Sequence, residues 1–203
     1  MNAQNKLAGY GAILLLGIFA PFLFPAYMFQ LAALWLMILF ALTWDIMGGQ
    51  MGYNSLGNIF FFGAGMYISA LVQVGLYYNI GEYTAAHGAI KVDFTPEQYY
   101  NGLILGMIAA AIGSVIFAVI IGRVVFGLRG PYFAIGTLGV ALAAGELIGT
   151  WEWVGGGGGI PLPVFPGGPE ARSQMFYYLC FVLAVLTFLT LKWIYSKRFG
   201  HAI

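Results

Sequence analysis

Six apolar runs, each close to the length of a membrane-spanning helix, follow one another along the chain of 203 residues. A helix needs about 20 consecutive apolar residues to cross the hydrocarbon core of a bilayer. The runs cover residues 7–26, 29–48, 56–78, 99–126, 132–149 and 175–195. Only 7% of the residues are charged, which is far below the ~25% of a soluble domain. The sequence therefore predicts an all-α polytopic membrane protein with about six transmembrane helices, of which the third and fifth could be partly re-entrant.

The basic residues favour one orientation of these helices. With the N-terminus inside, the two outer loops are residues 79–98 and 150–174, and they carry only Lys91 and Arg172. The inner segments carry the other basic residues, namely Lys6, Arg123, Arg129, Lys192, Lys197 and Arg198. Because cytoplasmic segments of membrane proteins are enriched in Lys and Arg, we expect both termini in the cytoplasm. Arg129 is interpreted as an anchor at the inner headgroups.

The sequence lacks the residue patterns of an enzyme. His87 and His201 lie in different predicted loops, and no set of Cys and His has the spacing of a metal site. The single cysteine, Cys180, lies in an apolar run and is interpreted as a small buried side chain. The net charge of +1 gives no basic field for nucleic acid. The glycine run 155–159 has no following Lys, so a phosphate-binding loop is not indicated.

A glycine-rich polar segment, residues 48–58, separates the second run from the third. Glycines let helix ends cross closely, and this segment is interpreted as a hinge near the cytoplasmic side. Asn54, Ser55 and Asn58 could satisfy backbone groups that the break sets free, or could line a path. The capping role is the favoured one.

Small residues recur at helical spacing in the third and fourth runs. They are Gly63, Ala64 and Gly65, followed by Gly102, Gly106, Ala110 and Gly113. Lipid gives helices no hydrophobic reason to associate, so small residues promote association by allowing close packing. A helix-packing seam is favoured over a ligand-binding face. Asp45 and Glu146 are acidic residues close to predicted interfaces, where they could reach headgroups, cap a helix or face a water-filled path.

Four short motifs resemble one family of transport proteins. The segments are SLGNIFFFGAGMY at residues 55–67, LRGPYFAIGTL at 128–138, VGGGGGI at 154–160 and SKRFGHAI at 196–203. In order and spacing they resemble the permease of branched-chain amino acid ABC importers, the LIV-type family, in its M-like subunit. Met66 and Val154 replace the family's usual Ala and Thr, and Gly145-Glu146 follows the second motif later than is usual.

By this resemblance, we expect the 203 residues to end before the family's coupling helix and last spans. We therefore interpret residues 1–203 as a single transmembrane permease domain that corresponds to the N-terminal part of the family's domain. It would be a fragment, a split gene product or a degenerate member.

The resemblance implies a function and a set of partners. The chain would form half of the translocation path of an ATP-driven importer for branched-chain or related amino acids. Its partners would be a second homologous permease, two cytoplasmic ATPase subunits and a periplasmic solute-binding protein. ATP would be used by the ATPase subunits, with no cofactor bound directly by this chain. The chain would be a multi-pass protein of the bacterial inner membrane, in contact with lipid.

Candidate site residues fall into three groups under this interpretation. The candidates for the hinge or path are Asn54, Ser55, Asn58, Gly63, Gly65 and Thr137. The candidates for partner contact in the outer loop are Gly155, Gly156 and Gly159. The candidates on the cytoplasmic coupling side are Arg198, Phe199 and Gly200.

Two other functions remain open from the sequence. One is a membrane scaffold or channel-like oligomer without energy coupling. The other is a permease for urea or short amides, because substrate choice depends largely on the solute-binding protein.

Overall fold

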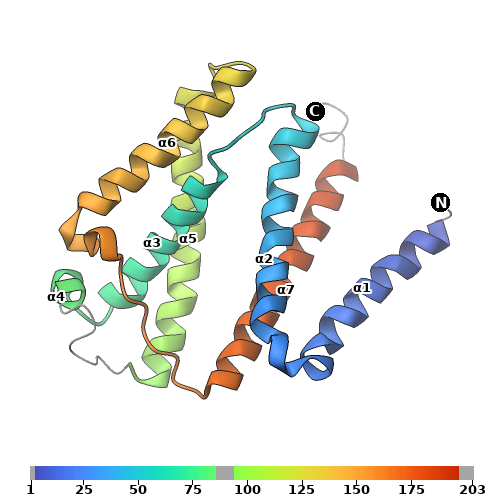
Figure 1. The fold of residues 1–203 in the computed structure, drawn as a ribbon, viewed down its shortest axis with the longest axis horizontal. Helices are drawn as coiled ribbons and strands as arrows, with labels where there is room; N and C mark the ends of the chain where they lie inside the picture. The colour runs from blue at the N-terminus through green and yellow to red at the C-terminus, as the bar shows by residue number, and fades with distance from the viewer. Residues whose placement is uncertain (1–2, 86–93, 197–203) are drawn as a thin grey trace. The chain divides into compact units, whose positions relative to one another are not determined.

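The computed structural model describes residues 3–85 and 94–196, and within them the chain is helical with no strand (Figure 1). The α-helices are α1 (Ala3–Leu23), α2 (Met28–Trp44), α3 (Asn58–Gly75), α4 (Ile80–Ala85), α5 (Pro96–Val125), α6 (Pro131–Thr150) and α7 (Pro169–Ser196). Short 3-10 turns are η1 (Pro25–Tyr27), η3 (Glu152–Val154) and η4 (Gly156–Gly158), and η2 (Asp45–Gln50) is a π-helix. The prediction of an all-α fold is confirmed.

Five helical segments of the described chain are long and apolar enough to cross a membrane. They are Pro25–Gln50, Asn58–Gly75, Pro96–Val125, Pro131–Thr150 and Pro169–Ser196, and the shorter apolar helix Gly9–Leu23 corresponds to the first predicted run. The protein is thus a polytopic membrane protein. The third and fifth runs, which were open to a re-entrant interpretation, form the continuous helices α3 and α6.

The helix α5 begins before its apolar run because a polar cap extends it. Thr95 and Gln98 form a capping box at the start of α5, with Pro96 as the first helical residue. The Thr95 side chain accepts a hydrogen bond from the Gln98 N–H (3.3 Å), and the Gln98 side chain accepts one from the Thr95 N–H (3.0 Å). Pro131 and Pro169 likewise begin α6 and α7.

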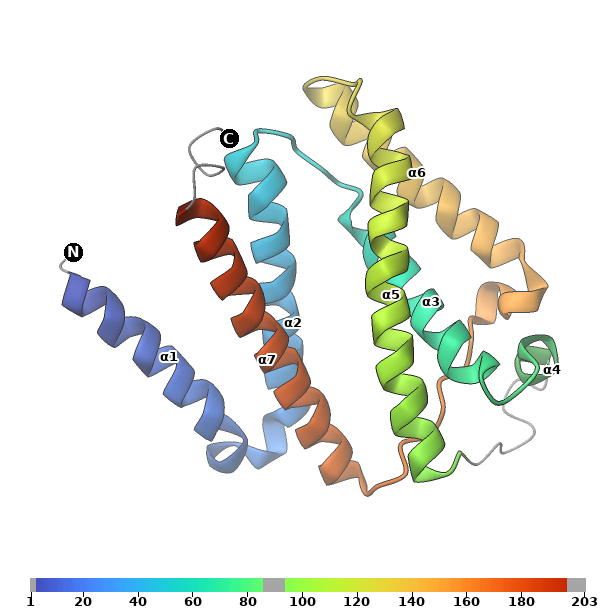
Figure 2. The same ribbon diagram turned by 180° about the vertical axis from the view of Figure 1, so that it is seen from behind.

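The chain forms two compact units. Unit 1 contains residues 1–45 and 167–203, and in it α2 and α7 pack side by side (Figure 2). Trp35 of α2 meets Phe181 of α7 edge-on, with ring centroids 4.9 Å apart. The fully buried Tyr177 of α7 donates a hydrogen bond to the carbonyl oxygen of Gly17 in α1 (2.7 Å). This bond fixes α1 to α7.

Unit 2 contains residues 46–166, and its main contact is between α3 and α5. Figures 1 and 2 show these two helices side by side, with α6 beside α3. The start of α3, the end of α5 and the start of α6 lie at one end of the unit. The opposite end holds α4, the start of α5 and the end of α6. This arrangement agrees with the prediction that the loops after the third and fifth runs lie on the same side.

Candidate functional site at the glycine-rich hinge

The break between the second and third apolar runs begins with a π-helix. The η2 segment covers Asp45–Gln50, and residues 51–57 then run without helical structure to the start of α3. The turn out of the π-helix is closed by the Tyr53 N–H, which donates to the Met47 carbonyl oxygen (2.8 Å). Gly52 has a φ of +71°, a conformation that side chains disfavour. π-helical turns are rare in proteins, and those that occur are often found at functional sites. We therefore take residues 45–57 as the candidate hinge.

Thr137 of α6 holds the end of this hinge. Its hydroxyl accepts a hydrogen bond from the Leu56 N–H (3.1 Å) and donates one to the Ala134 carbonyl oxygen (2.9 Å). Thr137 is only 8% exposed, so its donor and acceptor are both used inside the protein. The contact joins residues 81 positions apart in the chain. The structure thus places Thr137, one of the hinge or path candidates, against the hinge.

Gly57 allows the close approach of hinge and helix. A Cβ atom at this position would lie 2.9 Å from the Thr137 carbonyl oxygen and 3.0 Å from its Cβ. Ser55, which is 3% exposed, accepts a hydrogen bond from the Gly57 N–H (3.3 Å). Ser55 therefore satisfies a backbone group at the break.

Aromatic packing gives the hinge a second contact with the start of α6. The Tyr53 ring meets Phe133 edge-on at 5.0 Å and Phe126 at 5.9 Å. Phe126 and Phe133 stack on each other at 5.9 Å, and Phe133 is 2% exposed. Aromatic pairs in this geometry stabilise beyond their buried area. Tyr53 and Phe133 were not predicted as hinge residues, although Phe133 lies inside the second motif.

The other hinge and path candidates are placed differently. The side chains of Asn54 and Asn58 form no hydrogen bond with another described residue, and Gly57 at the start of α3 lacks a side-chain cap. A Cβ atom at Gly65 would lie 3.5 Å from the Ser114 hydroxyl of α5, whereas one at Gly63 would meet nothing within 4 Å. Gly65 therefore belongs to the seam between α3 and α5, and Gly63 does not.

The seam itself is built on glycines of α5. A Cβ atom at Gly102 would lie 2.9 Å from Gln73, and one at Gly106 would lie 2.8 Å from the Ser69 carbonyl oxygen. Gln73 is 4% exposed and donates through its side-chain amide to the Tyr99 carbonyl oxygen (3.4 Å). This geometry agrees with the packing interpretation of these small residues.

The glycine loop after α6 is folded by contacts within unit 2. Gly155, Gly156 and Gly159 all have positive φ, and a Cβ atom at Gly155 would collide with the Gly159 carbonyl oxygen. The Thr84 hydroxyl of α4 lies within hydrogen-bonding distance of the Trp153 carbonyl oxygen (3.2 Å), and its one proton is shared between this oxygen and carbonyl oxygens of α4 itself. The three candidate partner contacts therefore need glycine for their own backbone conformation. Their contact with a partner stays a prediction.

Charged and titratable groups are sparse at this site. Asp45 is half-buried, Glu146 is exposed, and the described residues contain no cluster of His, Cys, Asp and Glu that could hold a metal ion.

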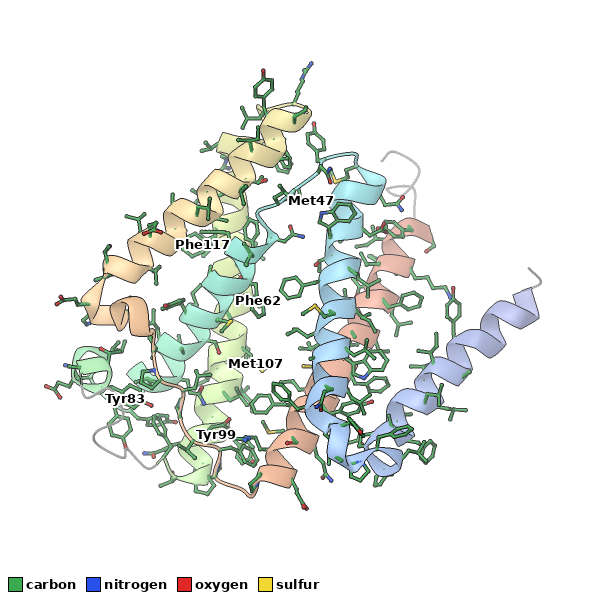
Figure 3. All side chains as sticks on the ribbon, viewed as in Figure 1. Met47, Phe62, Tyr83, Tyr99, Met107 and Phe117 are labelled. Carbon is green, nitrogen blue, oxygen red and sulfur yellow. The ribbon has the colours of Figure 1, made fainter. Side chains whose placement is uncertain are left out.

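Outside the spans, burial raises the pKa of Tyr83 in α4, with a smaller contribution from Tyr78. Figure 3 shows Tyr83 and Tyr99 at the end of unit 2 that holds α4 and the start of α5. Arg198, Phe199 and Gly200, the candidates on the coupling side, lie outside the described residues.

Fold and hinge together define a multi-pass membrane protein whose helices are packed on small residues and interrupted by a structured break. Residues 26–203 match the protein family described as "Branched-chain amino acid transport system / permease component". The chain belongs to this family, and the resemblance seen in its motifs is confirmed. A search of curated proteins and a search of solved structures gave no match.

Proposed function

We propose that the chain is the M-like permease subunit of an ATP-driven importer for branched-chain amino acids. The family match carries this proposal, because it covers all of the described spans from α2 to α7. The family match makes the chain a permease component, and under the proposal it acts as a transport subunit. Under the proposal it forms half of the translocation path in the bacterial inner membrane. A second homologous permease forms the other half.

Energy for transport comes from partners under this proposal. Two cytoplasmic ATPase subunits bind and hydrolyse ATP, and a periplasmic solute-binding protein delivers the amino acid. Closure of the ATPase pair would rock packed helices between inward and outward access, as in other domain movements of this kind. The hinge at residues 45–57 supports such a role, because it couples the start of α3 to α6 through Leu56 and Thr137.

Asn54 and Asn58 are the polar side chains that we assign to the path. Both are near the hinge, and neither side chain is bonded within the described chain, so their amides are available to a polar substrate. Ser55 and Thr137 instead position the hinge, since their hydroxyls are already used. Gly155, Gly156 and Gly159 would present the outer loop to the binding protein.

Uptake in vesicles tests the proposal. The chain is coexpressed with a homologous permease, the two ATPases and the binding protein, and labelled leucine is measured inside proteoliposomes. We expect uptake that requires ATP and disappears with a hydrolysis-defective ATPase. Uptake that continues without ATP would contradict the proposal and indicate a channel-like oligomer. Uptake of urea or a short amide in place of leucine would change the proposed substrate. It would not change the proposal that ATP drives transport.

A further inference from the structure

Two tryptophans lie next to each other just beyond the last residue of α6. Trp151 and Trp153 stack with ring centroids 5.7 Å apart and planes 29° apart. They are 54% and 45% exposed, so the pair presents a large apolar surface to its surroundings. Glu152 between them is also exposed. The pair thus combines apolar rings with polar backbone groups and a neighbouring carboxylate. This combination suits neither bulk water nor the hydrocarbon core of a bilayer.

The length of α6 sets the depth of the pair. Its 20 residues, Pro131–Thr150, rise about 30 Å, which is about the thickness of the hydrocarbon core of a bilayer. Arg129 precedes the helix and is exposed, as is Tyr132 in its first turn. A helix with Arg at one end therefore places Trp151 and Trp153 at the opposite membrane surface. Tryptophan is enriched at this level because its ring is apolar and its N–H is polar.

The backbone around the pair excludes a deeper position. After α6 the chain forms only two short 3-10 turns and then runs without regular structure to Pro169. Backbone of this kind is not found exposed to lipid in the hydrocarbon core, because its polar groups would be unsatisfied there. Leu162 and Val164 of the same loop are 63% and 75% exposed, which likewise favours contact with an apolar surrounding.

Contacts with α4 fix the tryptophans in place. The Thr84 hydroxyl, on a side chain that is 2% exposed, lies 3.2 Å from the Trp153 carbonyl oxygen and shares its one proton between this oxygen and carbonyl oxygens of α4. A Cβ atom at Gly81 would lie 3.3 Å from the Trp153 ring, so the indole packs directly over the backbone of α4. The pair is therefore packed against the rest of unit 2. A membrane surface that binds the pair also lies close to α4 and the glycine loop.

We propose that Trp151 and Trp153 form an anchor that inserts into the headgroup region of the lipid bilayer and fixes the depth of α6. The occupant of this surface is lipid. The glycine loop then lies along the membrane surface instead of projecting from it. This inference rests on the fold alone and does not depend on transport.

Fluorescence quenching by brominated lipids tests the anchor. The chain has five tryptophans, so Trp35, Trp44 and Trp193 are changed to Phe to leave the pair as the only indoles. The protein is reconstituted in phosphatidylcholine brominated either near the headgroup or near the acyl-chain end. We expect a larger loss of emission with the shallow bromines than with the deep ones. A variant that keeps only Trp35, which lies within the span of α2, serves as the control and should not prefer the shallow bromines.

A second variant guards against misfolding of the first. The double change Trp151→Phe and Trp153→Phe leaves the other tryptophans in place, and the wild-type spectrum minus the variant spectrum gives the emission of the pair. Quenching of that emission by aqueous acrylamide but by neither lipid would overturn the proposal, because the rings would then be in water. Protection from all three quenchers would also overturn it, because another protein surface would then cover the pair.

Discussion

Thr137 shows how one hydroxyl can hold two segments that are far apart in the chain. It accepts from Leu56 in the hinge and donates to Ala134 in its own helix. Threonine in a helix often donates back to the preceding turn, and here that bond orients the oxygen so that a lone pair faces the Leu56 N–H. Gly57 completes the contact by leaving room for the Thr137 backbone.

Thr137→Val removes the hydroxyl and keeps the shape of the side chain. The Leu56 N–H then loses its partner, and we expect a loss of about 1 kcal/mol in the free energy of unfolding. Hydrogen–deuterium exchange of residues 51–57 should become faster, and the melting temperature in detergent should fall. Thr137→Ser, which keeps the hydroxyl, should behave like the wild type. Equal exchange rates in the Val and Ser variants would show that the hydrogen bond does not hold the hinge.

Tyr83 gives the end of unit 2 that holds α4 a sensitivity to alkaline pH. Burial raises its pKa in the folded protein above the ordinary value of 10.0. Above pH 10.0 an unfolded chain would release this proton while the folded chain keeps it, so stability falls as the pH rises through the folded pKa. The difference between the phenolate absorbance of wild type and Tyr83→Phe should titrate above pH 10.0. Titration of that difference below this value would contradict the account.

Among the elements, α3 and α5 depend most clearly on glycine. Gly102 and Gly106 are one turn apart on α5, and each faces backbone or side-chain atoms of α3 that a methyl group would crowd. By contrast, α6 has glycines that face open space, including Gly139 and Gly145. The role of a glycine in a membrane helix can therefore be assigned only when the atoms that face it are known.

Gly106→Ala should therefore weaken the pair of α3 and α5. Its Cβ atom would meet the Ser69 carbonyl oxygen at 2.8 Å, which is backbone and cannot rotate away. We expect a loss of ~1–3 kcal/mol, the usual cost of overpacking. Gly139→Ala on α6, with nothing within 4 Å, is the matched control. Thermal unfolding in detergent measures both, and a Gly106→Ala protein as stable as the control would contradict this packing.

The glycine loop makes a similar distinction between neighbouring positions. Gly155 has a φ of +86°, and its Cβ would collide with Gly159, whereas Gly157 has open space around it. Gly155→Ala should cost at least ~1–2 kcal/mol for the left-handed conformation alone. Gly157→Ala should be nearly neutral. Limited proteolysis of the loop compares the two variants, and equal cleavage rates would show that the loop does not need glycine at position 155.

The sequence predicts some elements well because their signals are local. The break near Gly48, the start of α6 at Pro131 and the small-residue seam all follow from residue types at short spacing. The capping box of Thr95 and Gln98 was equally local and could have been recognised. The contacts of Thr137 with Leu56 and of Thr84 with Trp153 could not, because they join residues 81 and 69 positions apart. Such contacts depend on how whole helices pack.

The function proposed for the protein depends on how its chain crosses the membrane. In unit 2 the hinge and Arg129 lie at one end, and the glycine loop lies at the other, with α6 between them. From the excess of basic residues in the predicted inner segments, we expect the hinge end to lie in the cytoplasm. Motion of partner ATPases could then reach the hinge, while the glycine loop would face the binding protein.

Labelling of single cysteines on both sides of α6 tests this layout most directly. Cys180→Ser provides a background without cysteine, and Arg129→Cys and Gly157→Cys are then introduced one at a time at exposed positions. Intact cells are treated with a membrane-impermeant maleimide, and lysed cells show the total that can be labelled. The account predicts that intact cells label the cysteine at position 157 but not the one at position 129. Labelling of both, or of neither, in intact cells would place the two ends of α6 on the same side of the membrane and contradict it.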